Sequence, residues 1–177
     1  NKKLTSVEKA TSTILNNIPV LSSYEEIVLN SLGKTLAKPV TALLSNPPSD
    51  VSSMDGYALK NSDIENGVIE FTVIDESVAG KSSSKTVATT QTVRIFTGAK
   101  IPHGADRVIL QEDIKTLGNN LIKINKNKLE NNNFFIRKTG MDFKLGEKLI
   151  DNGEVLNTRN ISLCVASGNS WVTIRRK

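Results

Sequence analysis

Residues 46–58 read Asn-Pro-Pro-Ser-Asp-Val-Ser-Ser-Met-Asp-Gly-Tyr-Ala and form the most informative part of the sequence. Pro47 and Pro48 each fix φ and remove a backbone donor, so the stretch starts as a stiff loop. Asp55 and Gly56 follow closely, and a carboxylate beside a glycine after such a loop can be presented at the surface of a rigid scaffold. The stretch therefore predicts a break between two parts of the chain and a candidate functional residue directly after it.

Beyond this stretch, the sequence has the pattern of a β-rich protein. A helix is predicted over residues 4–18, where Thr5 and Glu8 have capping-box spacing, and a second over 158–167 with Thr158 as its cap. No βαβ alternation is present, so the pattern favours an α+β, β-rich fold. Short β-branched runs separated by polar turns predict strands at residues 68–74, 91–96, 107–110 and 121–125.

Three further predictions concern short elements. Asp-Asn-Gly at 151–153 predicts a hairpin that joins residues 148–150 to residues 155–156. Residues 30–37 have the composition of a short helix, although Gly33 weakens it. The apolar run 171–174 predicts a closing strand.

We expect two lobes. Residues 1–47 and 140–177 would form one lobe that is discontinuous in sequence, and residues 48–139 would form an inserted β-rich lobe. The Pro-Pro pair and the glycine-rich return at Gly140 are both typical of linkers.

Composition limits the possible functions. The chain has 177 residues, 23 Lys and Arg, 18 Asp and Glu, and a net charge of +5, which suits anionic partners. Cys164 is the one cysteine and His103 the one histidine, so an internal disulfide or a Cys/His zinc site is excluded. No apolar run approaches membrane length, and we expect a cytoplasmic protein without a membrane partner. The end at Arg175–Lys177 looks cut, which suggests a fragment.

Asp55 leads three candidate groups that could carry chemistry. Its carboxylate could bind a hard cation such as Mg²⁺ or take a proton, or the Asp-Gly pair could simply be a turn. Thr97 and Lys100 lie in the loop after a predicted strand, where a glycine would let backbone N–H groups approach an anion. Arg137 and Asp142 flank Gly140, and the group could clamp a phosphate or be an exposed charged turn.

These three groups occur in the same order in one protein family. Ser-Ser-Met-Asp-Gly-Tyr-Ala at 52–58, Thr-Gly-Ala at 97–99 and Arg137 followed by Gly140 and Asp142 resemble the N-terminal region, domains I and II, of the molybdopterin molybdenumtransferase family. This family comprises MoeA and its relatives, including the E domain of gephyrin. The resemblance spans nearly the whole chain.

The resemblance implies a fold, an activity and partners. Members are elongated dimers that insert molybdate into adenylylated molybdopterin, release AMP and use a divalent cation such as Mg²⁺, in the biosynthesis of the molybdenum cofactor. Their pterin-binding α/β domain lies downstream of the region matched here. The resemblance therefore implies an elongated two-lobed fragment of an enzyme, inactive alone, that forms homodimers and binds small anionic substrates.

Residue roles are carried over by the same resemblance. Asp55 matches an active-site aspartate that would organise metal or molybdate, and Thr97 matches a cleft threonine that donates a hydroxyl to an anionic ligand. Arg137 and Asp142 match residues that line the cleft, and Lys100 would attract anions. The chain departs from the family at 49, 51 and 141, where Ser, Val and Met replace the usual aromatic, Asn and Glu.

Two other interpretations stay open. A gephyrin-like scaffold or dimerisation module would keep the fold and the dimer surface without catalysis. A basic nucleic-acid binder is less favoured, because aromatic residues make up 5% of the chain and are not interleaved with basic ones.

Overall fold

The computed structural model describes residues 4–126 and 133–176 and divides the chain into two compact units. Unit 1 consists of residues 1–43 and 148–177, and unit 2 of residues 44–147. These divisions fall 4 and 8 residues outside the expected ones at 47/48 and 139/140. The inserted segment therefore takes in both the Pro-Pro loop and the glycine-rich return.

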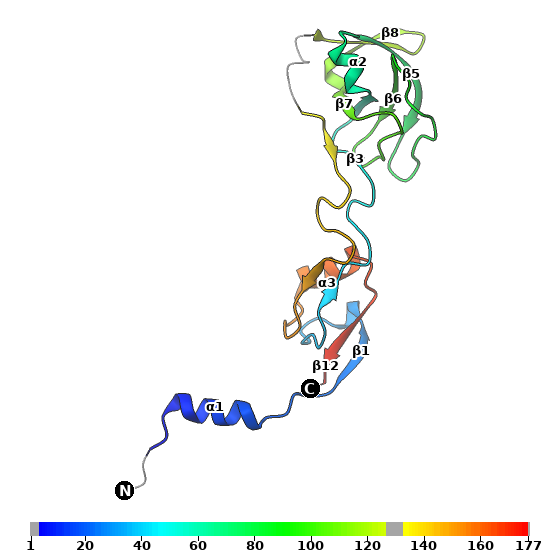
Figure 1. Cartoon of the computed structure of the whole chain (residues 1–177). Coiled ribbons are helices and arrows are strands. Elements are labelled where there is room, and N and C mark those ends of the chain that lie inside the picture. The colour runs from blue at the N-terminus through cyan, green and yellow to red at the C-terminus, as the bar shows by residue number, and fades with distance from the viewer. Residues whose placement is uncertain (1–3, 127–132, 177) are drawn as a thin grey trace. The chain divides into compact units, whose positions relative to one another are not determined.

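Unit 1 is a small α+β unit. Its elements are α1 (Val7–Asn17), β1 (Ser23–Ile27), η1 (Val28–Asn30), β2 (Val40–Thr41), β11 (Lys148–Ile150), α3 (Thr158–Ala166) and β12 (Trp171–Arg175). Strand β1 pairs antiparallel with β12, and β2 pairs antiparallel with β11. Both pairs join the two distant segments of the unit (Figure 1). The core is formed by buried residues from both segments: Val28, Leu36, Val40, Ile150, Leu156, Cys164, Val172 and Ile174.

Unit 2 is built around a six-stranded sheet with the order β7-β4-β6-β5-β9-β8. Strands β5 and β6 are parallel, and the other neighbours are antiparallel. Its elements are β3 (Val51–Ser52), β4 (Gly56–Leu59), α2 (Asn61–Glu65), β5 (Glu70–Ser77), β6 (Gln91–Ile95), β7 (Arg107–Leu110), η2 (Gln111–Asp113), β8 (Ile114–Gly118), β9 (Leu121–Ile124) and β10 (Ile136–Arg137).

The core of unit 2 has two buried clusters. One consists of Leu59, Phe71, Ile109, Ile122 and Ile124, and the other of Ala58, Ile95, Ala99 and Val108. Successive residues of β4 belong to different clusters, because side chains alternate between the faces of a strand. The sheet thus has apolar contacts on both faces.

Five of the predicted strands are confirmed, with at most small shifts at their ends, as β5, β6, β7, β9 and the closing strand β12. The two predicted helices are also confirmed, but their caps are not. Helix α1 is capped by Ser6, which accepts from the amide of Lys9, and α3 by Asn157, which accepts from the amide of Asn160.

The predicted hairpin is wrong. Residues 148–150 form β11, but β11 pairs with β2, and Val155 forms a bridge with Thr35. The predicted short helix over 30–37 is also wrong, since the helical turn ends at Asn30 and Leu36 enters the core. Cys164 belongs to the core of unit 1, where its side chain is fully buried.

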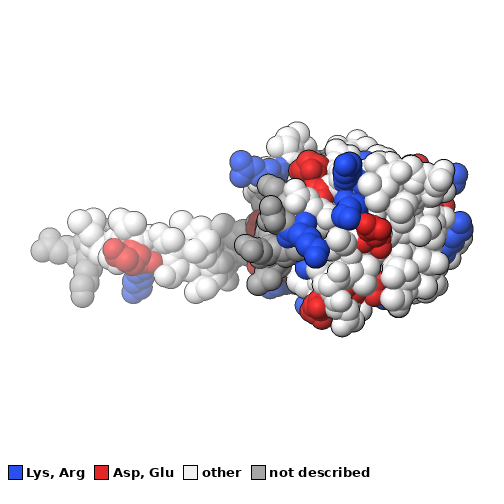
Figure 2. Space-filling model, turned by 90° about the horizontal axis from the view of Figure 1, so that it is seen from above, with Lys and Arg blue, Asp and Glu red and all other residues white. Residues whose placement is uncertain are grey.

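Charge is mixed on the face of unit 2 shown in Figure 2. Basic and acidic side chains alternate there without a continuous basic band. Among the residues that the structure describes, no helix has the length and apolar character of a membrane span.

Candidate functional site

The candidate site lies in unit 2, where strand β3 connects two loops. The amide of Ser52 donates to the carbonyl of Ala99 at 2.9 Å, and the amide of Gly98 donates to the carbonyl of Ser52 at 2.8 Å. On the other side, β10 pairs with β3, with Arg137 opposite Val51. Val51 also forms a backbone bridge with Lys100. Strand β3 thus brings the loop of Thr97 and Lys100 and the strand of Arg137 to its two sides.

Asp55 and Thr97 form a direct pair. One carboxylate oxygen of Asp55, Oδ1, accepts both the amide and the hydroxyl of Thr97, each at 2.8 Å. These two hydrogen bonds, and then the charge of Arg94, lower the pKa of Asp55 below its ordinary value of 3.8. Asp55 is therefore ionised at neutral pH, and its second oxygen is not used by Thr97.

The glycine after Asp55 is required by a close approach between strands. Gly56 opens β4, and a Cβ there would lie 2.0 Å from the carbonyl oxygen of Ile109 in β7. Gly56 has no positive φ in this structure, so its role is space and not backbone freedom. The Asp-Gly pair consequently starts a central strand and is not a turn between two strands.

Arg94 supports this end of β4. Its guanidinium donates to the carbonyl of Gly56 at 2.9 Å and to Oε1 of Gln111 at 2.5 Å. The same group lies over the rings of Tyr57 and Phe96, at 5.0 and 4.6 Å from their centroids. Sequence reasoning missed Arg94. A charged residue within the otherwise apolar run 93–96 was the signal that could have found it.

Arg137 and Asp142 form the second pair. Nη2 of Arg137 lies 2.5 Å from Oδ1 of Asp142, and both side chains are about two-fifths exposed. The amide group of the Asn46 side chain donates to Oδ2 of Asp142 at 3.0 Å. Within the described residues, no hydrogen bond or ion pair joins this pair to Asp55 and Thr97.

Asp50 fixes the turn that carries the second pair. Its Oδ1 accepts the amide and the hydroxyl of Thr139 at 2.9 and 3.1 Å, and its Oδ2 lies 2.8 Å from Nζ of Lys138. Lys138, and then the Thr139 amide, lower the pKa of Asp50. Sequence reasoning missed Asp50 as well, because its partners lie about 90 residues away.

A pocket of about 430 Å³ is lined by residues from the Pro-Pro loop, from the loop of Lys100 and from strand β10. Lys100 and Arg137 line it together with Pro47, Pro48, Ser49 and Gly98. The wall contains two cations and two serines, Ser49 and Ser82, and this composition suits an anionic ligand. Asp55 and Thr97 are not among its lining residues.

The one histidine and the carboxylates outside these pairs form no further site in the part of the chain that the structure describes. His103 is exposed in a turn, where its backbone carbonyl accepts the amide of Val87. Within residues 4–126 and 133–176, no three His, Cys, Asp or Glu side chains cluster as metal ligands would.

Comparison with known proteins places these features in one family. The family described as the MoeA N-terminal region (domain I and II) matches residues 5–168. Among curated proteins, the molybdopterin molybdenumtransferases of Nostoc sp. and Staphylococcus aureus are each 31% identical to the chain. The matches cover 97% and 95% of this chain, but 41% and 40% of those proteins, so the chain spans about two-fifths of their length.

Solved structures agree with the sequence comparison. Two crystal structures of the molybdopterin biosynthesis MoeA protein of Pyrococcus horikoshii match 99% of the chain with TM-scores of 0.85 and 0.86 and 28% and 29% identity. The matched part is 45% and 47% of those chains. The sequence motifs, the β-rich fold and these matches agree, and the chain belongs to the MoeA N-terminal region family.

Proposed function

We propose that the chain is the N-terminal part of a molybdopterin molybdenumtransferase, which inserts molybdate into adenylylated molybdopterin. The observation that carries the proposal is the Asp55–Thr97 pair at the start of β4, in a chain of this family. The curated relatives carry the name of this activity, and the chain matches two-fifths of their length. The activity accordingly belongs to a longer protein, and we expect this chain alone to be inactive.

In this proposal Asp55 acts through its charge. The low pKa keeps the carboxylate ionised at neutral pH, and the two bonds from Thr97 hold one of its oxygens in place. The other oxygen is available to a hard cation, and Mg²⁺ in proteins commonly takes one or two carboxylates and completes its shell with water and substrate phosphate. Asp55 would provide such a ligand for Mg²⁺ or would orient molybdate through a bound cation.

Thr97 serves in the first place to position Asp55. Its hydroxyl donates to the carboxylate, so direct donation to an anionic ligand requires that this bond be exchanged. Without the exchange, the Thr97 oxygen offers acceptor capacity alone. We therefore place Thr97 beside Asp55 as a positioning residue.

Lys100 and Arg137 would bind the anionic substrates. Both line the 430 Å³ pocket, and no carboxylate of the described residues forms an ion pair with Lys100. Arg137 uses Nη2 for Asp142, which leaves its other N–H groups for molybdate or phosphate oxygens. Asp142 orients this guanidinium.

The proposal includes a homodimer in the cytoplasm. The support for this part of the proposal is the family itself. The site residues of this chain do not form a complete catalytic set, so the remaining catalytic groups would come from other parts of the protein. A gephyrin-like scaffold without catalysis is the alternative outcome of the test below.

The test is Asp55→Asn in the full-length protein that contains this chain. We expect molybdate insertion to fall at least a hundredfold, because a neutral amide binds a hard cation far less well than a carboxylate. The free energy of unfolding should fall by only about 0.5–1 kcal/mol, as for Asp50→Asn, because Asp55 is half-buried and the amide oxygen of asparagine can still accept from Thr97. Asp151→Asn, an exposed aspartate of unit 1, is the matched control.

Two outcomes would contradict the proposal. Normal insertion by Asp55→Asn would remove the catalytic role of Asp55. Absence of insertion by the unmodified full-length protein, under conditions where a curated relative is active, would favour the scaffold instead.

A further inference from the structure

Unit 1 contains a second polar pocket, which shares no residue with the candidate site. Its volume is about 360 Å³, and pockets that hold small molecules usually have about 300 to 1,000 Å³. The walls come from Tyr24 in β1, residues 32–35 after η1, and Arg175 and Arg176 at the end of β12. It therefore joins both distant segments of the unit.

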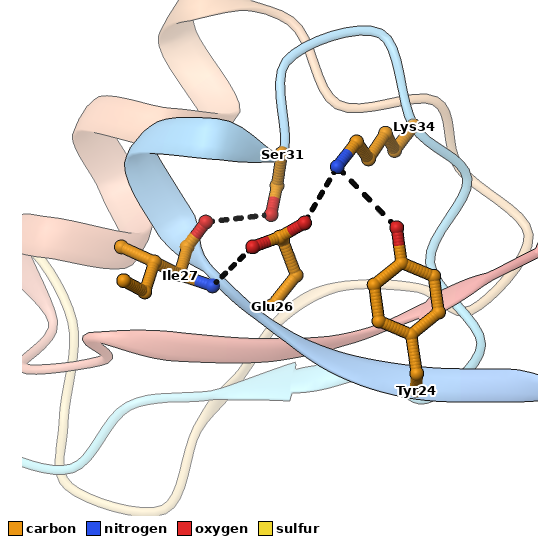
Figure 3. Close-up of polar contacts among 5 residues, drawn as sticks. All are labelled: Tyr24, Glu26, Ile27, Ser31 and Lys34. Atoms are coloured by element: carbon orange, nitrogen blue, oxygen red, sulfur yellow. Dashed lines mark hydrogen bonds and ion pairs between the residues drawn. The ribbon is translucent and has the colours of Figure 1, made fainter.

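A fixed lysine forms one wall. Figure 3 shows Nζ of Lys34 between Glu26 and Tyr24, with 2.7 Å to Oε2 of Glu26 and 3.4 Å to the Tyr24 hydroxyl oxygen. The other oxygen of Glu26 accepts the amide of Ile27, so both carboxylate oxygens are engaged. Glu26 raises the pKa of Lys34, and the ammonium is charged at neutral pH. Lys34 lines the pocket and Glu26 does not, although the Glu26 carboxylate compensates much of the lysine charge from 2.7 Å.

Arg176 provides the second cation. Tyr24 pairs with Ile174, and side chains alternate along a strand, so Arg176 shares the face of Tyr24. The guanidinium carbon of Arg176 lies 5.3 Å from the centroid of the Tyr24 ring, and Nζ of Lys34 lies 5.8 Å from the same centroid. Arg175 also lines the pocket, but its side chain starts from the other face of β12 and donates to the carbonyl of Leu21 at 3.0 Å.

The side-chain polar groups of the lining residues can all donate hydrogen bonds. Lys34 has one N–H left after its bonds to Glu26 and Tyr24, and the Tyr24 hydroxyl, which accepts from Lys34, still has its own hydrogen to donate. The hydroxyl of Thr35 is a further donor. Among the residues that the structure describes, no carboxylate pairs with Arg176. A wall made of donors, two of them charged, is complementary to an oxyanion, which can only accept.

We propose that this pocket binds the phosphate group of a small phosphorylated molecule. Arg176 and Lys34 supply charge, and the hydroxyls of Tyr24 and Thr35 donate to the remaining phosphate oxygens. Leu32, which is exposed at the rim, would contact the part of the ligand that carries the phosphate. The inference uses unit 1 alone and does not depend on the proposed function.

The experiment is a titration of the chain with inorganic phosphate and with methyl phosphate at constant ionic strength. Binding is followed by the NMR amide shifts of Tyr24, Lys34 and Thr35. Residue-resolved shifts separate this pocket from the one lined by Lys100 and Arg137. We expect saturable shifts, and affinity about tenfold lower for Arg176→Gln, because the variant loses a charge-assisted hydrogen bond to the phosphate.

Two variants serve as controls. Arg159→Gln removes an exposed arginine of α3 in the same unit and should bind phosphate as the unmodified chain does. Tyr24→Phe keeps the ring that packs on the core and removes the hydroxyl, so it should weaken binding severalfold while the melting temperature is unchanged.

Three results would overturn the proposal. Shifts that do not saturate, or that are lost equally in Arg176→Gln and Arg159→Gln, would indicate general attraction to a positive chain. Full retention of affinity in Arg176→Gln would remove the main ligand. Acetate binding as tightly as phosphate would show that the pocket recognises a carboxylate instead.

Discussion

At the scale of single residues, the site depends on side chains that hold backbone in place. Asp55 and Asp50 each accept the amide and the hydroxyl of a threonine, Thr97 in one case and Thr139 in the other. Each aspartate thus fixes a loop that is distant in sequence. The same residue type with the same bonding pattern therefore supports both halves of the candidate site.

Gly56 allows a sharp test of why glycine follows Asp55. Gly56→Ala would place a methyl group 2.0 Å from a carbonyl oxygen of β7, and backbone cannot yield as a flexible side chain can. We expect the free energy of unfolding to fall by about 3 kcal/mol or more, since overpacking typically costs 1–3 kcal/mol. Urea denaturation measures it.

Gly80→Ala is the control for this substitution. Gly80 has a φ of +82° and open space around its Cβ position, so alanine there meets backbone strain without a clash, at about 1 kcal/mol. Equal losses in the two variants would contradict the close-approach explanation for Gly56.

Asp50 makes stability depend on pH. Its pKa in the folded chain is below the ordinary value of 3.8, so folding is favoured by its ionised form at pH values above 3.8. That contribution is lost as the pH falls through the folded-state pKa. We expect Asp50→Asn to be less stable at pH 7 by about 0.5–1 kcal/mol, a modest figure because the side chain is partly exposed.

The measurement is the difference in unfolding free energy between Asp50→Asn and the unmodified chain from pH 2 to 7. The difference should be constant near neutral pH and shrink towards zero below pH 3.8. A difference that stays unchanged at low pH would show that the charge of Asp50 is not responsible.

At the scale of elements, sequence patterns predicted strands well and pairing badly. Residues 107–110 form a strand with the predicted ends because an apolar β-branched run is a local signal. The hairpin after residue 148 failed because β11 finds its partner in β2, more than 100 residues earlier. The turn residues at 151–153 are a local signal, and they do not indicate that a strand distant in sequence will pair with β11 instead.

In the candidate site, too, local features were predicted from sequence and tertiary contacts were not. Asp55, Thr97, Arg137 and Asp142 were found by motif, and the structure pairs them two by two. Arg94 and Asp50 were missed, since their roles depend on rings and amides that only the fold brings near. A motif identifies the residues, whereas their supports follow from tertiary packing.

Helix α3 gives a prediction at this scale. Asn157 accepts the amide of Asn160 at 3.0 Å, and the side chain of Asn160 accepts the amide of Asn157 at 3.0 Å. Asn157→Ala should therefore cost about 1 kcal/mol of unfolding free energy, as loss of an N-cap usually does. Thr158→Ala, at the first helical position, should cost less than about 0.5 kcal/mol. Thermal unfolding of both decides, and a larger loss in Thr158→Ala would restore the cap predicted from sequence.

At the scale of the whole chain, unit 2 is an insertion whose two ends lie together. The amide of Leu145 donates to the hydroxyl of Ser45 at 3.0 Å, and Asn46 forms a bridge with Phe143. In unit 1, the strands that flank the insertion, β2 and β11, are paired with each other. Each unit also has its own buried core. Because of this arrangement, we expect that either unit can be removed without unfolding the other.

We therefore predict that residues 44–147 fold as an isolated segment. A chain in which residues 43 and 148 are joined by a short Gly-Ser linker should also fold, because paired β2 and β11 leave little distance to span. Both products should show dispersed amide spectra and cooperative melting, and the amides of Phe71 and Ile122 should be as protected from exchange as in the unmodified chain, since both residues are buried in unit 2. Folding of the joined unit 1 is the more demanding test, because unit 1 is smaller than unit 2. A smaller unit buries a smaller fraction of its surface and is less stable. If residues 44–147 gave a collapsed spectrum while the joined unit 1 folded, the sheet of unit 2 would need the rest of the chain, and the division into two independent units would be wrong.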